Sequence, residues 1–548
     1  MRNPDIHRSN GETALVAALA ICVSVISFLF YFRHDAVLLY GDAVAHINIA
    51  RRVFDSRTPG LLQLGTVWLP LPHLLMIPFL LSDWAWRTGA GGAIPSMIAY
   101  VFGAVGIFRL VRESLSFRSG PDLAARIAAW LAVIVYAANP NLIYLQTTAM
   151  TEPLYLAFFV WTTVYFCEFA HRVSLADAER QAAAYPALVK CGMCLAAACL
   201  TRYDGWFLAG VTFAAAAAVV LRNRNFGVGG LRTFLLLVAA APMLWIAYNA
   251  IIYRNPLEFA NGPYSARAIE QKTSRPDYPP HPGTHNVPQA GSYFLKSAEI
   301  NVAAGSWQKL WVLLLIVGTT MTLTFNHRLW PLLLLWIPLP FYLLSIGYGG
   351  VPIFLPEWWP FSYYNVRYGL EMLPAFAVFV ALTMHFIAGS IRNGTGKVLV
   401  RITLFFFVAA CYGSVWRAQP VCYREAWINS RSRIALETDL AARLKAFPEN
   451  STLLMYLGDH VGAVQRAGIP LRQVINEGNH RSWRQPFDPE GLWERALSNP
   501  SQHADFVVAS EGDPVSTRLQ TQGLIPITKI RVPGQATATI YETHSHSR

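Results

Sequence analysis

The sequence predicts an all-α polytopic membrane domain of about 11–13 transmembrane helices, followed by a small C-terminal α/β domain outside the membrane. Composition is the first reason. Of 548 residues, 54% are hydrophobic and only 14% are charged, whereas soluble domains carry about 25% charged residues because water must solvate their surface. The spacing of apolar runs is the second reason. Runs of about 20 residues, long enough to cross a bilayer as a helix, recur up to about residue 416 and are absent after it. We therefore expect two domains, 1–416 and 417–548.

Eleven apolar segments account for the expected spans. They are 13–32, 92–111, 124–138, 153–171, 187–201, 204–221, 233–253, 308–325, 330–347, 368–391 and 398–415. No small-residue cleavage site follows the first, so we expect it to remain as an uncleaved anchor. The segment Leu69–Leu81 is shorter and rich in proline, so we expect it to lie at the interface or to re-enter the membrane. Proline-broken segments leave room for two further spans.

Basic loops indicate the orientation, because short loops rich in Lys and Arg stay in the cytoplasm. If Leu69–Leu81 does not cross, all the basic clusters share the side of the N-terminus. They are Arg109/Arg112/Arg118/Arg126, Arg172/Arg180/Lys190, Arg222/Arg224/Arg232, His327/Arg328 and Arg392/Lys397/Arg401. The loops 33–67, 139–152, 201–204, 254–307 and 347–367 and the C-terminal tail are then extracytoplasmic, in an inner or plasma membrane. If Leu69–Leu81 does cross, the orientation inverts.

The net charge of +12 follows the same pattern. The basic residues lie between apolar runs and form no stripe with interleaved aromatic residues. Loops that flank membrane spans therefore explain the excess, and we expect the lipid bilayer as a partner and no nucleic acid.

After residue 416 the composition becomes that of a soluble domain. Residues 423–447 have the pattern of an amphipathic helix, and β-type runs follow at 452–457, 506–509, 525–532 and 537–541. Helix-like stretches separate these runs. The sequence therefore predicts a small α/β domain here.

Ionisable residues beside the membrane are the first candidates for chemistry, because burying them is costly. Asp42 follows the first span, comes directly after Gly41 and precedes His46 by one helical turn. A structural role, as the N-cap of the helix through residues 47–54, fits the same position. Both readings stay open on spacing alone.

Glu152, Arg202, Asp204 and Arg367 also lie where loops meet spans. Purely structural roles would also explain them. Glu152 could stabilise the N-terminus of a helix, Arg202 could form a salt bridge with Asp204, and Arg367 could extend its charged end to the membrane surface. The predicted topology nevertheless places Asp42, Glu152, Arg202 and Arg367 at one outer membrane boundary. A carboxylate can remove a hydroxyl proton there and arginine can clamp a phosphate bidentately. The set therefore suits attack on a phosphate-linked group.

The same motifs resemble those of the GT-C glycosyltransferases. Gly41-Asp42-Ala43 is similar to their catalytic acidic motif, and Trp68-Leu69-Pro70-Leu71-Pro72-His73 resembles the proline-rich "PPLH" segment that follows it. Met150–Leu154, Leu200–Trp206 and Arg367-Tyr368 with Pro374 are similar to later landmarks. The nearest group is the dolichyl-phosphate-mannose-protein mannosyltransferase-like family (family 39), which includes the aminoarabinose transferases. The resemblance covers residues 13–390 in order and spacing.

The resemblance implies a polyprenyl-phosphate-linked sugar as donor, with its lipid in the membrane and its sugar outside. Asp42 would be the general base that deprotonates an acceptor hydroxyl, with inversion at the anomeric carbon. Glu152 would position acceptor or sugar, and Arg202 and Arg367 would bind the donor phosphate. The further residues expected to contact substrate are His46, His73, Asp204, Tyr264 and Tyr368.

Two departures from the family pattern concern the substrate. Asp42 is followed by Ala43 where eukaryotic protein mannosyltransferases have Glu, and the second motif reads Pro-Leu-Pro-His. The sugar and the acceptor, which is a protein, a lipid or a polysaccharide, stay open. No cofactor is expected, although a divalent ion on His46, His73, Glu152 or His281/His285 is an alternative that spacing leaves open.

Two functions of other classes also stay open. A transporter or lipid-linked-sugar flippase would place charges at the membrane midplane and repeat its fold in matching halves, whereas these charged motifs gather at one face. A non-catalytic assembly protein that keeps the fold is the second. The loop 254–307 is long enough to be a lid over the site or an ordinary outer loop.

Overall fold

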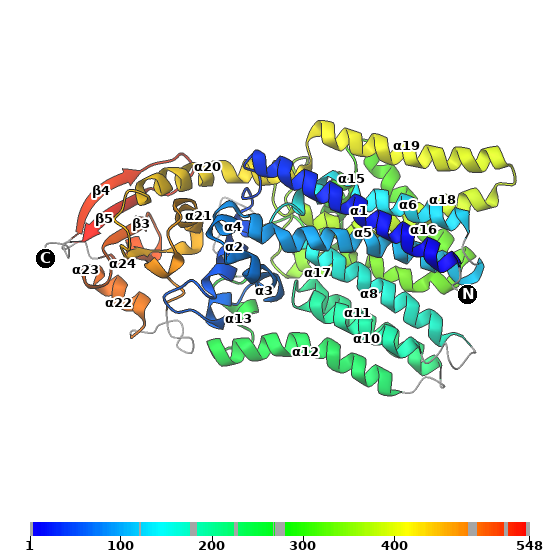
Figure 1. Cartoon of the computed structure of the whole chain (residues 1–548), viewed down its shortest axis with the longest axis horizontal. Coiled ribbons are helices and arrows are strands. Elements are labelled where there is room, and N and C mark those ends of the chain that lie inside the picture. The colour runs from blue at the N-terminus through cyan, green and yellow to red at the C-terminus, as the bar shows by residue number, and fades with distance from the viewer. Residues whose placement is uncertain are drawn as a thin grey trace.

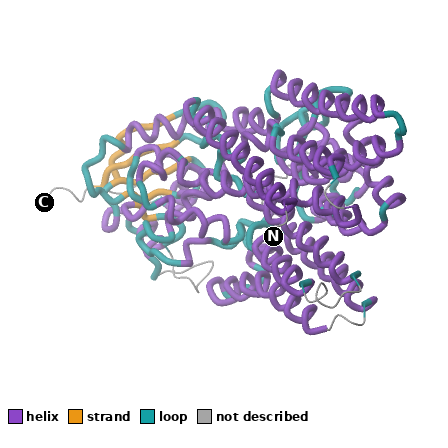
Figure 2. Tube along the Cα trace, turned by 45° about the vertical axis from the view of Figure 1, so that its right-hand side comes forward, coloured by secondary structure: helices purple, strands orange, loops and turns teal. Residues whose placement is uncertain are grey.

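The fold class predicted from the sequence is confirmed. The computed structural model describes residues 4–119, 122–175, 183–223, 228–266, 268, 280–479, 490–519 and 524–543. Long helices form a bundle at one end of the molecule, and a small domain that carries the strands and the C-terminus forms the other end (Figure 1). The strands are confined to that end in the second view as well (Figure 2).

Nine helical segments of the described chain are long and apolar enough to cross a membrane, by length and composition. They are α1 (Pro4–Arg33), α5 (Ala90–Ser119), α8 (Glu152–Val173), α11 (Asp204–Arg222), α12 (Val228–Tyr253), α16 (Trp307–Phe325), η3 with α17 (His327–Trp336, Pro338–Tyr348), η4 with α18 (Val366–Met372, Leu373–Ser390) and α19 with α20 (Gly394–Ala418, Val421–Leu444). The expected spans 124–138 and 187–201 are the shorter apolar helices α6 (Leu123–Ala137) and α10 (Ala184–Cys199). Each of the eleven expected spans therefore coincides with an apolar helix.

The first loop folds into short helices that lie beside the bundle. They are α2 (Gly41–Arg52), η1 (Leu61–Leu64), α3 (Leu71–Met76), η2 (Ile77–Leu80) and α4 (Asp83–Thr88). The segment 71–80 spans about 15 Å at 1.5 Å per residue, half the thickness of a bilayer core. It is therefore too short to cross as a helix.

Prolines divide two of the expected spans. The segment 330–347 is split into the 3₁₀ helix η3, which contains Pro331, and α17, which begins at Pro338. Proline lacks the backbone N–H that a continuous helix requires. In the same way η4 precedes α18, whose second residue is Pro374. The 3₁₀ turn of η4 carries Arg367 into the bundle.

Part of the segment 254–307, which the sequence predicted as a loop, is helical. It contains α13 (Glu258–Asn261) and the helix α15 (Val287–Val302), which packs against η4 and α17. Most of its proline-rich part, 275–282, lies outside the described residues. The short helix α7 (Pro140–Leu145) in the loop 139–152 completes this end of the bundle.

The C-terminal domain is a five-stranded sheet of order β2-β1-β3-β5-β4 flanked by short helices. Its strands are β1 (Leu453–Met455), β2 (Val474–Ile475), β3 (Phe506–Ser510), β4 (Leu524–Ile530) and β5 (Ala538–Thr543); its helices are α21 (Leu457–Ala467), η5 (Leu471–Gln473), α22 (Leu492–Ser498), α23 (Pro500–His503) and α24 (Pro514–Arg518). β2, β1 and β3 are parallel, whereas β5 and β4 are antiparallel. The helix expected at 423–447 is α20, which contacts both α7 in the bundle and α21 in this domain.

Gly369 generates the first prediction, because it brings η4 against the backbone of α15. A Cβ at this position would collide with the main chain of Ser297 and Ala298. We expect Gly369→Ala to destabilise the protein by about 1–3 kcal/mol, the usual cost of overpacking. Thermal unfolding in detergent measures this. Gly389→Ala in α18, where a Cβ meets nothing within 4 Å, is the matched control; equal unfolding temperatures for both variants would contradict the prediction.

Candidate active site

Arg367 lies at the centre of a buried network that joins three distant parts of the chain. Its Nε donates to Glu152 Oε1 at 2.9 Å, its Nη1 to Glu425 Oε1 at 2.8 Å and its Nη2 to Asp42 Oδ2 at 2.6 Å. Charge-assisted hydrogen bonds of this kind are about twice as strong as neutral ones. Each nitrogen of the guanidinium therefore holds a different carboxylate.

Arg202 forms the second centre and is linked to the first through Glu152. Its Nη1 donates to Glu152 Oε1 at 3.3 Å, and its Nε donates to Asp204 Oδ2 at 3.1 Å. Its Nη2 lies 2.9 Å from the hydroxyl of Tyr342 and 3.1 Å from Glu371 Oε1. One carboxylate oxygen, Glu152 Oε1, thus bridges the two arginines.

Helix starts position the acids of this network. Glu152 is the first residue of α8 and Asp204 the first residue of α11, while Asp42 lies in the first turn of α2. An acid at a helix N-terminus interacts favourably with the helix dipole. The N-cap of α2 is Tyr40, without a side-chain cap bond. The carboxylate of Asp42 is therefore committed to Arg367 and does not cap the helix.

Aromatic rings hold the two guanidinium groups in place. The ring of Tyr368 lies 4.8 Å from the guanidinium carbon of Arg202 and 5.0 Å from that of Arg367. Tyr40 lies 5.1 Å from Arg367. A cation near the face of an aromatic ring is stabilised by the ring quadrupole, more so when water is excluded.

Exposure singles out Asp42 within the network. Its side chain is 42% exposed, whereas those of Glu152, Glu371 and Glu425 are at most 2% exposed. Solvent therefore reaches this group of charges at Asp42. The side chain of Arg367 directly behind it is only 7% exposed.

The network has more carboxylates than guanidinium groups. Its seven members are Asp42, Glu152, Arg202, Asp204, Arg367, Glu371 and Glu425, five carboxylates for two guanidiniums. Glu152 Oε2, Asp204 Oδ1 and Glu371 Oε2 have no hydrogen-bond partner among the described residues. Every nitrogen of both arginines is engaged. The site thus has spare acceptors for hydroxyl groups, and an anion that approaches Arg367 meets the carboxylates that already hold it.

His46 and His73 lie behind this site as a buried pair. His46 Nδ1 and His73 Nε2 are 2.9 Å apart, and the ring of Trp68 lies 4.6 Å from that of His46. Burial lowers the pKa of His46 to about 3, with the charges of Arg367 and Arg202 adding to the effect. Burial also holds the pKa of His73 well below its usual value. Both rings are therefore neutral at physiological pH.

The other residues expected to contact substrate occupy different environments. Asp204 and Tyr368 belong to the site described above. Tyr264 is half exposed in the segment after α13, outside the network. Burial raises the pKa of its phenol, and the carboxylate of Glu477 in the C-terminal domain adds to the effect.

Among the described residues, no group of three or more His, Cys, Asp or Glu side chains is placed to hold a metal ion. His281, named above as a possible ligand, uses both ring nitrogens within the protein. They bond to the Ile353 carbonyl and the Gly283 amide, each at 2.9 Å.

Glu425 and Tyr342 are the site residues that sequence reasoning missed. Glu425 lies on α20, within the helix expected as part of the separate C-terminal domain. Its carboxylate also accepts from the backbone N–H of Val366 at 2.8 Å, so it fixes η4 as well as Arg367. The only signal in the sequence was one acid shortly after an apolar span, with nothing to indicate its partner.

An apolar groove of about 620 Å³ runs from α3 and η2 along α5 and α8 to α10. Leu74 on α3 and Phe79 on η2 line one end of the groove, Ile98 and Phe102 line its α5 wall, and Trp161 lies on α8. α3 also carries His73, and α8 begins at Glu152. Leu154, which also lines the groove, lies two residues after Glu152, so part of the groove lies near the start of α8.

No family model matches the chain, and no curated protein sequence is similar to it. Among solved structures, the chain is similar to ArnT from Cupriavidus metallidurans bound to undecaprenyl phosphate, with a TM-score of 0.59 and 14% identity over 97% of this chain and 98% of that one. The apo state of the same protein gives a TM-score of 0.55 at 12% identity, with the same coverage. Similarity over both chains' lengths confirms the GT-C fold expected from the sequence.

The burial of Glu425 generates the second prediction. Removing Glu425 leaves Nη1 of Arg367 and the backbone N–H of Val366 without their buried acceptor, and an unsatisfied buried donor costs about 1–3 kcal/mol, more when it is charged. We therefore expect Glu425→Ala to lower the free energy of unfolding by about that amount, measured by chemical unfolding in detergent. The exposed Glu449→Ala is the control. Equal stability of the two variants would show that Arg367 does not depend on Glu425.

The buried histidine pair generates the third prediction. The unfolded chain binds a proton at His46 near the ordinary pKa of 6.5, but the folded protein does so only near 3. The free energy of unfolding therefore has its full value above pH 6.5 and falls as the pH drops toward 3. Each such histidine lowers it by up to about 1.4 kcal/mol per pH unit. We expect His46→Gln to lose less stability between pH 7.5 and pH 5 than the wild type does. The exposed His34→Gln should keep the wild-type pH dependence; an unchanged dependence in His46→Gln would refute the assignment.

Proposed function

We propose that this protein is an integral-membrane glycosyltransferase that moves a sugar from a polyprenyl-phosphate donor to an acceptor hydroxyl on the extracytoplasmic side. One observation carries the proposal. A solvent-exposed carboxylate, Asp42, is bonded to a buried guanidinium, Arg367, at the open face of a chain with the fold of ArnT. That relative binds undecaprenyl phosphate.

The apolar groove supports a lipid-linked donor. A volume of about 620 Å³ between α3, α5 and α8 accommodates several isoprene units, and its lining offers them an apolar environment. Because α8 begins at Glu152, a chain in this groove brings its phosphate to the arginine–carboxylate network. The polyprenyl phosphate lies in the groove and the sugar lies beyond it, at Asp42.

Phosphate binding and activation of the base are one event in this mechanism. Nη2 of Arg367 is the nitrogen paired with the exposed carboxylate, so the donor phosphate replaces Asp42 there. The freed carboxylate then accepts the proton of the acceptor hydroxyl. The hydroxyl oxygen attacks the anomeric carbon from the face opposite the phosphate, and the configuration inverts.

The remaining residues hold this arrangement during transfer. Glu152 keeps Arg202 and Arg367 together, so that both stabilise the negative charge on the departing phosphate. Asp204 and Tyr368 fix the two guanidiniums, and the neutral pair His46 and His73 supports α2 behind Asp42. Tyr264, half exposed, contacts the acceptor, which is a protein, a lipid or a polysaccharide.

The fourth prediction tests this function directly with radiolabelled polyprenyl-phosphate sugars and purified protein in lipid. We expect the wild type to release sugar from its lipid, to an acceptor or slowly to water. Asp42→Asn should lose on the order of a hundredfold or more in rate, because it removes the general base. Asp83→Asn is the matched control, since Asp83 is also exposed and bonds an arginine, Arg51, at 2.6 Å.

Three outcomes of this experiment oppose the proposal in different ways. Equal rates for wild type and Asp42→Asn would show that Asp42 is not the general base and serves only as the ion-pair partner of Arg367. Equal losses in Asp42→Asn and Asp83→Asn would indicate a general effect on folding. Movement of intact labelled lipid between leaflets, without sugar release across a panel of donors and acceptors, would identify a flippase.

A further inference from the structure

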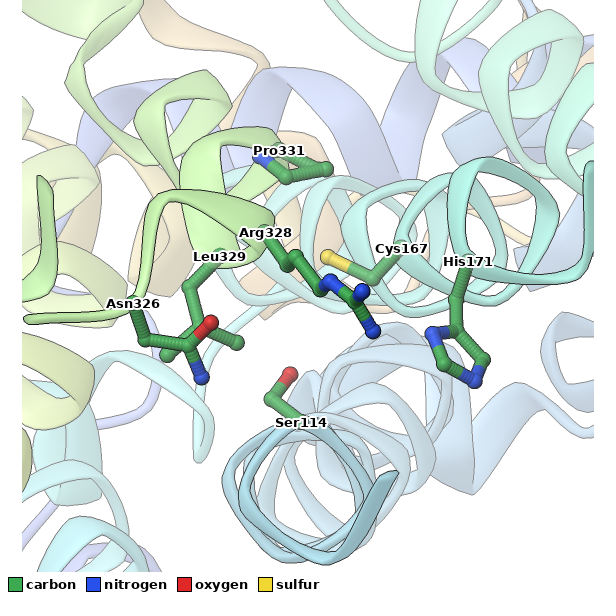
Figure 3. Close-up of a pocket in the computed structure, with 7 residues that line it drawn as sticks. All are labelled: Ser114, Cys167, His171, Asn326, Arg328, Leu329 and Pro331. Atoms are coloured by element: carbon green, nitrogen blue, oxygen red, sulfur yellow. The ribbon is translucent and has the colours of Figure 1, made fainter. Parts of the chain in front are cut away.

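A second polar pocket lies at the far end of the bundle. Its polar lining comes from three helical segments: Ser114 on α5, Cys167 and His171 on α8, and Asn326 and Arg328 where α16 meets η3 (Figure 3). Glu152 begins α8 and His171 lies in its last turn, which separates the pocket from the arginine–carboxylate network by about 30 Å along the helix. The two sites are therefore distinct.

Three polar side chains of the pocket, those of Ser114, Asn326 and Arg328, are available to a ligand. Arg328 has no ion-pair or hydrogen-bond partner in the part of the chain that the structure describes, which contrasts with Arg202 and Arg367. Asn326 occupies the N-cap position of η3, yet its side chain makes no cap bond. The hydroxyl of Ser114 projects toward the same space (Figure 3).

The chemistry of these groups is that of an anion site. A guanidinium, an amide, a hydroxyl and an imidazole face the cavity, and among the residues that the structure describes no carboxylate lines it. Glu168, one turn before His171, is already paired with Arg172 at 2.7 Å. The cavity measures about 30 Å³, room for one or two atoms the size of a water molecule, and so admits the oxygens of a phosphate while the rest of the group stays outside.

The position of the pocket points to a lipid as the source of that phosphate. Arg328 is the second residue of the apolar segment His327–Tyr348, and Ser114 lies near the end of Ala90–Ser116. Both residues therefore lie at the boundary of the apolar region. Phe325 and Leu323, exposed on the adjoining turn of α16, provide an apolar surface for an acyl chain.

We propose that this pocket binds the phosphate of an anionic membrane lipid, at the end of the bundle opposite Asp42. Arg328 binds the phosphate oxygens, and Asn326 and Ser114 donate further hydrogen bonds. Basic pockets between membrane helices are the sites where anionic headgroups bind. The bound lipid holds the ends of α5, α8 and η3 together. This proposal does not depend on the proposed glycosyltransferase activity.

The fifth prediction tests the pocket with phosphatidylglycerol as the probe. The full chain is purified in detergent and titrated with this lipid, and bound lipid is counted by native mass spectrometry. We expect Arg328→Gln to weaken binding by about tenfold or more, because it removes a charge-assisted contact. Arg222→Gln, at an exposed arginine at the end of α11, should bind as the wild type does. Asn326→Ala should give an intermediate loss.

Two further measurements separate the possible ligands. Thermal unfolding without added lipid should be the same for wild type and Arg328→Gln, because the side chain is exposed and unpaired. Phosphatidylcholine should not occupy the site. Binding of phosphatidylglycerol that is equal in wild type and Arg328→Gln would overturn the proposal. So would inorganic phosphate that displaces the lipid and raises the unfolding temperature of the wild type alone, since the site would then take free phosphate.

Discussion

The attachment of Arg367 to three carboxylates is the constraint on which this structure depends. The partners lie 325, 215 and 58 residues away in sequence, at Asp42, Glu152 and Glu425. They belong to the first loop, the helical bundle and the helix that leads into the C-terminal domain. One planar guanidinium therefore fixes the mutual positions of three parts of the chain, which apolar packing in a membrane fixes only weakly, because lipid is as apolar as the side chains.

The same constraint explains why the site opens at one point only. Buried charges are tolerated where they are paired and hydrogen-bonded, and losing one partner is costly. Glu152 and Glu425 are therefore held in place, and so is Arg202 through its own carboxylates. Asp42 alone gives up its bond at low cost, because water can solvate the released carboxylate. The electrostatics of the network thus leave one carboxylate free to exchange.

Sequence reasoning predicted the spans and the charged positions because both rest on local rules. An apolar run of bilayer length becomes a helix, and the acids at 152 and 204 lie where helices begin. It did not find Glu425 or β2, because their roles depend on partners far along the chain. A two-residue strand such as Val474–Ile475 carries no periodicity of its own. The order within 254–307 was missed for the same reason, since α15 becomes apparent only through its packing on η4 and α17.

The bond between Asp42 and Nη2 of Arg367 has a consequence for the proposed transferase. In the proposed mechanism a phosphate takes the place of Asp42 on Nη2 of Arg367 and breaks the 2.6 Å bond there, so the net affinity for the donor is the difference between two similar interactions. This exchange lowers the affinity for the donor, but it couples activation of Asp42 to donor binding. Asp42 becomes available to take a proton only after the donor phosphate has bound. An empty site keeps its base occupied, whereas a site that holds its donor presents a free carboxylate beside the sugar.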